Sequence, residues 1–333
     1  MSLRPAVITG VGSYVPDQVL SNADLERIVE TTDDWIVSHT GIRERRIASE
    51  EQASSDLGIV ACQRALEDAG LTPADVDMIV CPTVTPDHIF PVTANLIQDR
   101  LGAGHCAAFD LLSGCTGFVY GLFVARQFIA TGEMETVLVV STEKLTSITD
   151  WTDRSTCVLF GDGAGAAVVQ AGEGDISDIG LMSFVLESYG EHGFLLQVPA
   201  GGSRKALTPE LLEAHENCLW MNGPELFKLA VRGIPEVAEK AISKAGITNA
   251  DVDWVIMHQA NLRIIEAAAR RLDVPEERVV VNVDRYGNTS GASMAIALDE
   301  IYRDGRLQPG DTILMVGFGA GFSLGGAVVR WGH

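Results

Sequence analysis

Positive charge is scarce in this sequence. The 333 residues include 24 Lys and Arg against 45 Asp and Glu, which gives a formal net charge of −21. Such a field repels the phosphates of nucleic acids and the headgroups of anionic membranes. The composition therefore argues against a nucleic-acid-binding protein and against a membrane-surface protein, although it leaves room for a local basic patch.

Long hydrophobic runs are also missing. The longest uncharged apolar stretch extends from Leu111 to Ala125, which is short of the roughly 20 residues that a bilayer requires. The apolar segment after Arg4 is too short for the core of a secretory signal, and it is typical of a first buried strand. We therefore expect a cytoplasmic protein that does not associate with membranes.

The six cysteines form no closely spaced pair, and no Cys-x-x-Cys motif occurs. Disulfide frameworks and zinc sites normally show such spacing. The pattern therefore favours a reducing compartment and argues against both a disulfide framework and a zinc site. Hydrophobic residues make up 47% of the chain. This content excludes disorder as the main state, and a chain of this length can bury a large core.

Segments rich in Val and Ile alternate with helical patterns, which indicates an α/β architecture. Residues 175–220 look irregular by comparison. The expected strands are Ala6–Thr9, Met78–Cys81, Ala107–Leu111, Thr136–Ser141, Thr156–Phe160, Trp254–Met257, Thr312–Val316 and Gly326–Trp331.

The chain contains an internal repeat. Residues 69–77 recur at residues 245–253 with all but two positions identical, and later buried strands match at the same separation. We infer two related halves, residues 1–175 and residues 176–333, that pack together over a shared core. Equivalent strand ends would meet near the axis that relates the halves, which predicts one site built from both.

Cys115 has a clear chemical context. It follows an expected strand and a Ser-Gly turn, and it precedes a nearly all-apolar helix. At a helix N-terminus, unpaired backbone N–H groups and the helix dipole both favour a thiolate, so the sequence predicts an activated nucleophile. An ordinary buried cysteine is the alternative, and it is the interpretation we adopt for Cys62, Cys81, Cys106, Cys157 and Cys218.

His258 and Asn288 lie at matching places in the second half. His258 follows an expected strand, where a rigidly held imidazole can donate a hydrogen bond to a developing oxyanion. A capping role is the alternative, since Asn261 could begin the next helix. Asn288 lies in a Gly-Asn-Thr-Ser-Gly segment that also suits a plain turn. As a neutral donor, it could stabilise negative charge without giving up a proton.

Two glycine-rich segments, Gly161–Gly165 and Gly317–Gly321, look like dinucleotide-binding loops but lack the right context. A Rossmann loop follows a strand and opens a helix, whereas both segments here continue into β-type sequence. We therefore expect tight turns between strands and no bound nucleotide. The second turn could present a backbone N–H to a neighbouring site.

Taken together, these motifs resemble β-ketoacyl-acyl-carrier-protein synthase III over essentially the whole chain. The resemblance implies a thiolase-like α/β fold, with duplicated βαβαβαββ halves in a five-layer αβαβα sandwich, and a homodimer. The matching motifs are Cys115, His258–Asn261, Gly287–Ser290, the two glycine-rich turns, Thr32–Trp35 and Thr40–Arg43.

The resemblance implies an acyltransferase that initiates fatty acid synthesis by a decarboxylative Claisen condensation. Cys115 would take the acyl group from a primer acyl-CoA, with the backbone N–H groups of Cys115 and Gly321 as the oxyanion hole. Malonyl-acyl-carrier protein would then lose CO₂ while His258 and Asn288 hydrogen-bond the enolate. No metal or other cofactor is implied, because the CoA thioester is a substrate and two neutral donors can carry the charge.

The same resemblance assigns residues that bind coenzyme A. Trp35 and Arg154 would hold the adenine between an aromatic ring and a guanidinium. The pantetheine tunnel would be formed by Asn222, Gly223, Phe227 and Asn261.

The acyl pocket and the carrier-protein surface are assigned in the same way. Leu145 and Phe160 would line the acyl pocket, and Phe90 would close that of the partner subunit. Arg263 would dock the carrier protein, which is acidic, so docking requires a local basic patch on this acidic chain. Further candidates for the patch are Arg43, Arg45, Arg46, Lys228, Arg232, Arg270 and Arg271.

Three positions depart from the family pattern. His39 replaces a common Arg, Ser155 a common Gly, and Leu324 a common Trp. These changes concern the primer and its delivery and leave the Cys-His-Asn chemistry in place. The alternative function is a synthase III-like condensing enzyme of secondary metabolism, of quinolone or polyketide type, or one that takes a longer primer. A catalytically inactive binding subunit is disfavoured because Cys115 is present.

Overall fold

Two five-stranded sheets form the centre of the computed structural model, which describes residues 3–176 and 178–332. The first sheet has the order β1-β7-β6-β4-β5 and the second β12-β11-β13-β14-β8. The strands of the first are β1 (Ala6–Tyr14), β4 (Met78–Pro82), β5 (Ala107–Leu111), β6 (Thr136–Glu143) and β7 (Gly163–Ala171). Those of the second are β8 (Gly180–Ser188), β11 (Trp254–Met257), β12 (Val279–Val280), β13 (Thr312–Gly319) and β14 (Ser323–Arg330).

The two sheets share one pattern of strand pairing. In the first, β4 lies parallel to β5 and β6, whereas β7 is antiparallel to β6 and β1. In the second, β11 lies parallel to β12 and β13, and β14 is antiparallel to β13 and β8. The duplicated architecture expected from the repeat is therefore confirmed, while the boundary between residues 175 and 176 stays a prediction.

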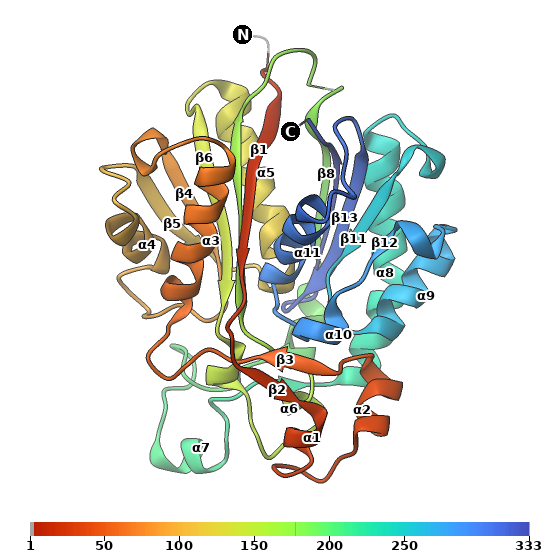
Figure 1. The fold of residues 1–333 in the computed structure, drawn as a ribbon. Coiled ribbons are helices and arrows are strands. Elements are labelled where there is room, and N and C mark those ends of the chain that lie inside the picture. The colour runs from red at the N-terminus through yellow and green to blue at the C-terminus, as the bar shows by residue number, and fades with distance from the viewer. Residues whose placement is uncertain (1–2, 177, 333) are drawn as a thin grey trace.

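Helices cover both faces of each sheet and complete the five-layer sandwich (Figure 1). Helices α5 and α11 fill the space between the sheets, α3 and α4 cover the outer face of the first, and α8 covers the second with α9 beside it. No helix in the described ranges is both long and apolar enough to cross a membrane. The helices are α3 (Ser54–Asp68), α4 (Thr93–Leu101), α5 (Gly117–Thr131), α8 (Gly223–Lys244), α9 (Leu262–Leu272) and α11 (Ala292–Arg303).

An aspartate clamp explains why the repeated segments are so similar. Asp77 Oδ2 accepts hydrogen bonds from the backbone N–H groups of Glu135 and Thr136, at 2.8 and 2.9 Å. Asp253 Oδ2 accepts one from Thr312 N at 2.8 Å. Each aspartate thus ties the start of one central strand to the start of its neighbour, and it satisfies backbone donors that the sheet leaves free.

Two local assignments were wrong. Thr156–Phe160 is not a strand, because its first two residues end the short helix α6 (Arg154–Cys157). Asp153 caps this helix and accepts a hydrogen bond from Ser155 N at 2.8 Å. The segment expected to be irregular, residues 175–220, contains the regular strand β8, which pairs with β14, and only short elements after it. Of the two glycine-rich segments, Gly317–Gly321 does run from the end of β13 into the turn to β14, whereas Gly161–Gly165 only leads into β7.

Small elements close one end of the two sheets, opposite the chain termini (Figure 1). A long connection between β8 and α8 lies at the same end and carries the short elements β9 (Leu196–Gln197), α7 (Pro209–Glu213) and β10 (Trp220–Met221). We call the small elements that close this end the cap. The cap does not include the β8–α8 connection and comprises β2 (Val19–Ser21), α1 (Asn22–Leu25), α2 (Asp33–Thr40), β3 (Glu44–Arg46), α6 and α10 (Val283–Tyr286).

Arg45 joins the cap to the segment before β7. Its side chain is fully buried, and the guanidinium donates hydrogen bonds to Leu20 O at 3.1 Å, Asn22 Oδ1 at 2.8 Å and Val158 O at 2.8 Å. Burial lowers the pKa of Arg45 to about 10, so the side chain is still charged at neutral pH. Arg45 therefore cannot belong to a carrier-docking patch, and that candidate was wrong.

Replacing Arg45 with methionine keeps the apolar bulk and removes the donors. Three buried acceptors then lose their partners, and we expect the free energy of unfolding to fall by about 3 kcal/mol. Chemical denaturation measures this change. The matched control is Arg43→Met, at an exposed neighbour, which should change stability by less than about 0.5 kcal/mol. Equal stability of the two variants would contradict the structural role of Arg45.

Candidate active site

A cavity of about 450 Å³ lies between the cap and the two sheets and extends to Cys115. Most of its walls are apolar, and a few polar groups converge at its inner end, which is typical of a ligand site. The residues that line it include Trp35, Cys115, Phe160, Phe227, His258 and Asn288. The structure therefore brings the three predicted catalytic residues into one cavity, with Cys115 supplied by one sheet unit and the other two by the second.

Cys115 lies in a single 3-10 turn, Gly114–Thr116, between β5 and α5. Gly114 has a φ of +57°, a conformation that favours glycine. A Cβ at Gly114 would lie 2.7 Å from Ala320 N, and one at Gly319 would lie 2.6 Å from Cys115 N. The two glycines thus let the end of β13 contact the cysteine turn directly, which fixes the thiol at the junction of the two sheets.

The Cys115 thiol is neutral in this structure. Burial raises its pKa to about 12, and the Ser290 side chain and the backbone N–H groups of Cys115 and Ala320 lower it only in part. The expectation of a resting thiolate was therefore wrong, because the loss of water outweighs the stabilisation from the N-terminus of a helix that opens with a 3-10 turn. The thiol must lose its proton during the reaction.

The backbone donors beside Cys115 Sγ are the N–H groups of Cys115 itself and of Ala320. The family resemblance had implied Gly321, one residue later. Gly321 follows Ala320 in the turn between β13 and β14, where it has a φ of +80°. The conformation of a tight turn decides which of its backbone N–H groups points toward Cys115 Sγ. Sequence spacing alone does not identify that residue.

His258 is buried directly after β11, where its backbone N donates to Val316 O at 3.0 Å. Its Nδ1 lies 2.8 Å from Ser293 Oγ, and Ser293 Oγ accepts a hydrogen bond from Gln259 N at 3.2 Å. The serine proton is therefore free to point at Nδ1, and this arrangement is compatible with the tautomer that carries the imidazole proton on Nε2. Burial lowers the pKa of His258 to about 3, so the ring is neutral at physiological pH.

Gln259 holds His258 in register with the segment that leads to Asn288. Its side-chain Nε2 donates to Met257 O at 2.8 Å and Val280 O at 3.1 Å. Its Oε1 accepts from the backbone N–H groups of Asn282 and Val283, at 3.0 and 3.2 Å. With these bonds the buried amide is satisfied on both sides, which makes it a rigid clamp between β11 and the cap.

Asn261, and not His258, caps the following helix. Asn261 Oδ1 accepts a hydrogen bond from Arg263 N at 2.8 Å at the start of α9, and its Nδ2 donates to His39 O at 3.0 Å. The capping alternative for His258 is therefore excluded. His258 is held by Ser293 and is bordered by the Phe318 ring, at 5.7 Å between ring centroids.

Asn288 is fixed by backbone bonds on both sides. Its N donates to Leu159 O at 2.8 Å, and its O accepts from Gly161 N at 3.1 Å. The side-chain Oδ1 accepts from Ser290 N at 2.8 Å. Because the amide oxygen is already engaged, the amide nitrogen is the group of Asn288 that is left to donate a hydrogen bond to a ligand.

Trp35 and Arg154 lie together at the cap. The Arg154 Cζ atom is 4.6 Å from the Trp35 ring centroid, so the two side chains contact each other, and an adenine would have to enter between them. The His39 ring also stacks on Trp35, at 4.5 Å between centroids, and its Nδ1 lies 2.8 Å from Trp35 O. His39, one of the three residues that depart from the family pattern, thus contacts Trp35.

The other residues expected to bind substrate fall into three groups. Gly223, Phe227, Asn261, Phe160 and Arg263 line the cavity. Asn222 and Leu145 do not line it, since Asn222 caps α8 beside Gly223 and Leu145 is buried in the core. Phe90 is 83% exposed on the loop between β4 and α4, outside the cavity of its own chain. Of the remaining departures from the pattern, Ser155 lines the cavity and Leu324 is buried.

Some residues around the site were not identified from the sequence: Ala320, Phe318, Ser290, Ser293 and Glu143. Ser290 and Ser293 follow Asn288 by two and five residues. Their position in the sequence could therefore have marked them as neighbours of the site. Glu143 is an acid at the end of strand β6, which is buried throughout, and a buried acid of this kind is unusual. Ala320 carries no chemical signal, because only its backbone is involved.

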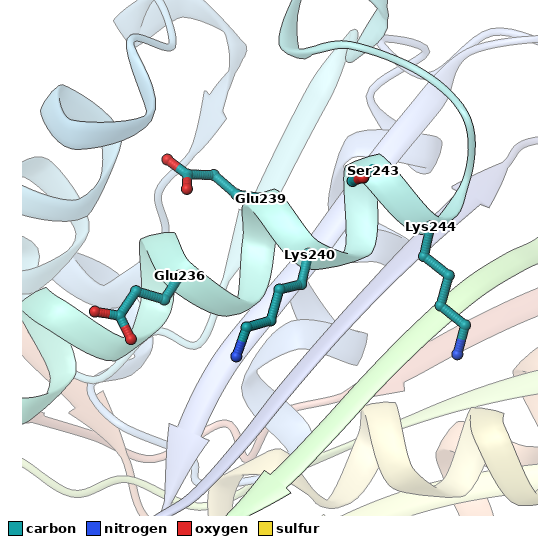
Figure 2. A pocket seen from close by; sticks show the side chains of 5 residues that line it. All are labelled: Glu236, Glu239, Lys240, Ser243 and Lys244. Carbon is teal, nitrogen blue, oxygen red and sulfur yellow. The ribbon is translucent and has the colours of Figure 1, made fainter.

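A second hollow lies on the outer face of α8, and it does not have the features of a catalytic site (Figure 2). All five side chains around it come from one helix, and Glu239 points away from the two lysines. Lys240 pairs with Glu187 at 2.5 Å, and Lys244 Nζ donates to Phe184 O at 3.0 Å. The lysines are therefore engaged by the neighbouring strand. In the described part of the chain, no His, Cys, Asp and Glu side chains cluster as metal ligands.

Comparisons with known proteins agree with this geometry. The family model 3-oxoacyl-[acyl-carrier-protein] synthase III matches residues 109–190, and its C-terminal counterpart matches residues 242–331. A β-ketoacyl-[acyl-carrier-protein] synthase III of Caldanaerobacter subterraneus is 50% identical over 326 residues, which cover 98% of each chain. One of Symbiobacterium thermophilum is 49% identical over 334 aligned positions and the full length of both.

A solved structure is also similar over the whole chain. The crystal structure of 3-oxoacyl-[acyl-carrier-protein] synthase III from Aquifex aeolicus superposes with a TM-score of 0.90 at 43% identity, over 98% of this chain and 100% of that one. Both the sequence and the thiolase-like sandwich are thus shared over the full length. The chain belongs to the β-ketoacyl-acyl-carrier-protein synthase III family.

Proposed function

We propose that this protein condenses a primer acyl-CoA with malonyl-acyl-carrier protein to give a β-ketoacyl-acyl-carrier protein, through an acyl-Cys115 intermediate. The observation that carries the proposal is the convergence of Cys115, a neutral His258 and the Asn288 amide in one largely apolar cavity, in a member of this family. The reaction would begin fatty acid synthesis in the cytoplasm.

In the first half-reaction, Cys115 Sγ attacks the thioester carbon of the acyl-CoA, and coenzyme A leaves. The backbone N–H groups of Cys115 and Ala320 lie beside the sulfur, where they can hydrogen-bond the oxyanion of the tetrahedral intermediate. Trp35 and Arg154 would hold the adenine at the cap, and Phe227 would contact the pantetheine in the cavity. Coenzyme A enters and leaves as part of a substrate, and the proposed chemistry uses no cofactor.

In the second half-reaction, malonyl-acyl-carrier protein occupies the cavity and loses CO₂. The thioester oxygen becomes an enolate oxygen, which His258 Nε2–H and the Asn288 amide can hydrogen-bond. Both donors are neutral and keep their protons, so the enolate carbon remains a nucleophile and attacks the acyl carbon on Cys115. The low pKa of His258 therefore suits this role, because a charged imidazolium would tend to protonate the enolate.

A homodimer would complete the acyl pocket. Ile89, Phe90 and Leu112 are all strongly exposed, at 85%, 83% and 79%. Exposed apolar side chains of this size are typical of a protein interface. We propose that the partner subunit covers them and that Phe90 then closes the partner's acyl pocket.

Mass spectrometry of the intact protein tests the proposed function. The protein is incubated with acetyl-, isobutyryl-, hexanoyl- and dodecanoyl-CoA in turn, and the modified peptide is mapped. We expect a single acyl group on Cys115 that disappears on addition of malonyl-acyl-carrier protein, with formation of the β-ketoacyl product. An adduct formed only with long acyl groups would favour the alternative primer. No adduct with any thioester, or an adduct on another cysteine, would contradict the proposal.

Charge reversal at Arg263 tests the docking surface. Arg263 lies at the cavity mouth with its guanidinium 5.8 Å from the Phe227 ring centroid. Because an acidic carrier protein would meet a negative charge there, we expect Arg263→Glu to raise KM for malonyl-acyl-carrier protein by about tenfold. Acylation of Cys115 by acyl-CoA should change little. Arg306→Glu, which breaks a surface pair with Asp304, is the control. Equal loss of both steps would argue against docking.

A further inference from the structure

The proposed reaction leaves the proton of the Cys115 thiol without a destination. The thiol is neutral, so its proton must leave as Sγ attacks the thioester. His258 is a poor acceptor, because its Nδ1 already faces the Ser293 hydroxyl and burial disfavours the charged ring. A neighbouring group that can gain a proton near neutral pH is better suited than His258 to take this proton.

Glu143 is a buried carboxyl group beside the cysteine that neither half-reaction uses. It ends strand β6 and is fully buried. Its Oε2 accepts hydrogen bonds from Thr85 Oγ1 at 2.6 Å, Val84 N at 3.1 Å and Thr83 Oγ1 at 3.3 Å. All of these donors are neutral. Burial raises the pKa of Glu143 to about 7, although the hydrogen bonds partly oppose this shift. Glu143 can therefore gain and lose a proton near neutral pH.

Ser290 belongs to a segment that packs between β6 and the cysteine turn. A Cβ at the next residue, Gly291, would lie 2.7 Å from Ser141 Oγ on β6 and 3.3 Å from Gly114 O in the turn. Ser290 Oγ is buried and makes no hydrogen bond of normal geometry within residues 3–176 and 178–332, yet the same hydroxyl lowers the pKa of both Cys115 and Glu143. The backbone of Ser290 has a φ of +51°, a strained conformation for serine of a kind that often occurs at functional sites. The Ser290 hydroxyl is thus near both Cys115 and Glu143 and forms a regular hydrogen bond with neither of them.

The groups around Glu143 carry little competing charge. Lys144 is its neighbour in sequence, but Lys144 Nζ donates to Ser49 O and Gln52 O at 2.8 and 2.6 Å. The negative charge of Glu143 raises the pKa of both Cys115 and Cys81. The other acids on the neighbouring elements are engaged elsewhere: Asp110 accepts from Thr93 N and Ala94 N, and Asp87 from Ser55.

We propose that Glu143 accepts the proton of the Cys115 thiol through the Ser290 hydroxyl and returns it when the sulfur is released. This inference rests on the proposed function and adds a proton route to it. Glu143 touches no substrate, so it acts as a positioning residue for the proton, and Ser290 is the relay.

The protons and electrons balance over both half-reactions. During acylation the S–H bond breaks, its electron pair forms the Sγ–C bond, and the proton passes to Ser290 Oγ as the serine proton passes to Glu143. Coenzyme A leaves with its bonding pair as a thiolate, which takes a proton from water. During condensation the enolate carbon attacks the acyl carbon, the Sγ–C pair returns to sulfur, and Glu143 returns the proton by the same route.

The pH dependence of Cys115 acylation by acetyl-CoA tests this route in rapid-mixing experiments. For the wild type we expect the rate to rise as the pH rises through about 7, because only ionised Glu143 accepts a proton. Glu143→Gln should slow acylation about 100-fold at pH 7.5 and remove this inflection. Glu143→Asp should restore part of the rate together with the inflection, and Ser290→Ala should resemble Glu143→Gln.

Decarboxylation of malonyl-acyl-carrier protein provides the control measurement, because that step needs no thiol deprotonation. Glu143→Gln should retain it within about threefold, as expected when the removed group does not act in the measured step. Wild-type acylation rates in Glu143→Gln, with the inflection in place, would overturn the inference. If Glu143→Gln lost both steps, Ser290→Ala would decide: loss of the inflection supports the route, and its retention overturns it.

Alkylation of Cys115 by iodoacetamide separates this inference from the proposed function. The reagent requires the same loss of the thiol proton and no acyl-CoA site. We expect the same inflection near pH 7 in the wild type and its absence in Glu143→Gln, whereas Cys218 should alkylate alike in both. A wild type that shows this inflection but is never acylated by acyl-CoA would contradict the proposed function and leave the proton route standing. A profile that is identical in both proteins would contradict the route.

Discussion

Cys115→Ala is expected to abolish acyl transfer and leave malonyl decarboxylation in place. Without the sulfur no covalent intermediate forms, so condensation should fall on the order of 10⁴-fold or more, as for other removed nucleophiles. His258 and the Asn288 amide remain in the cavity, and decarboxylation requires only these donors. Release of CO₂ and formation of the β-ketoacyl product are measured on the same sample.

Cys218→Ala is the matched control, since Cys218 is a free thiol outside the cavity. This variant should retain both activities. Full condensation by Cys115→Ala, or loss of CO₂ release together with condensation in a folded protein, would contradict the separate role assigned to the thiol.

His258→Ala is expected to have the opposite profile. Removing one donor to the enolate oxygen should lower kcat for decarboxylation on the order of 10²- to 10³-fold, whereas acylation of Cys115 by acyl-CoA should change little. The rate of decarboxylation by the wild type should also be flat between pH 5 and 8. The pKa of His258 lies at about 3, so the ring stays neutral throughout this range and starts to gain a proton only well below it.

His105→Ala is the control for this substitution, because His105 is exposed on the connection before β5. Asn288→Asp extends the test, since it replaces the donor with a carboxylate where negative charge develops and should be at least as damaging as His258→Ala. Parallel loss of acylation and decarboxylation in His258→Ala would contradict a role confined to the enolate. A decarboxylation rate that titrates near pH 6.5 would show that the ring is not held neutral.

The fold was predictable because its signals are local and repeated. Residues 69–77 and 245–253 each carry the aspartate that clamps two neighbouring strands. The same structural requirement in both halves accounts for the sequence repeat. Cys115 and His258 each follow a strand in its own half, which was enough to predict one shared cavity. The meeting of these residues in one cavity could thus be predicted from residue type and position, whereas their chemical roles stay a proposal.

Other features could not be read in this way, because a local cap overrode the composition or because they depend on distant contacts. Thr156–Phe160 has strand-like composition, but Asp153 caps a short helix there. The protonation state of Cys115 depends on burial between two sheets, which outweighs the local helix N-terminus. Arg45 looks like a surface cation in sequence, and only its bonds to Asn22 and Val158 show that it is buried.

Because Gly114 packs directly against Ala320, the activity of the enzyme should depend on how closely its two sheets pack together. The sulfur belongs to one side of this junction, and Ala320, the proposed oxyanion donor, belongs with the imidazole to the other. A separation of only an ångström or two would leave both sheets intact and yet misalign the reacting groups. On gentle heating, turnover should therefore cease at a lower temperature than the one at which circular dichroism records the melting of helices and strands.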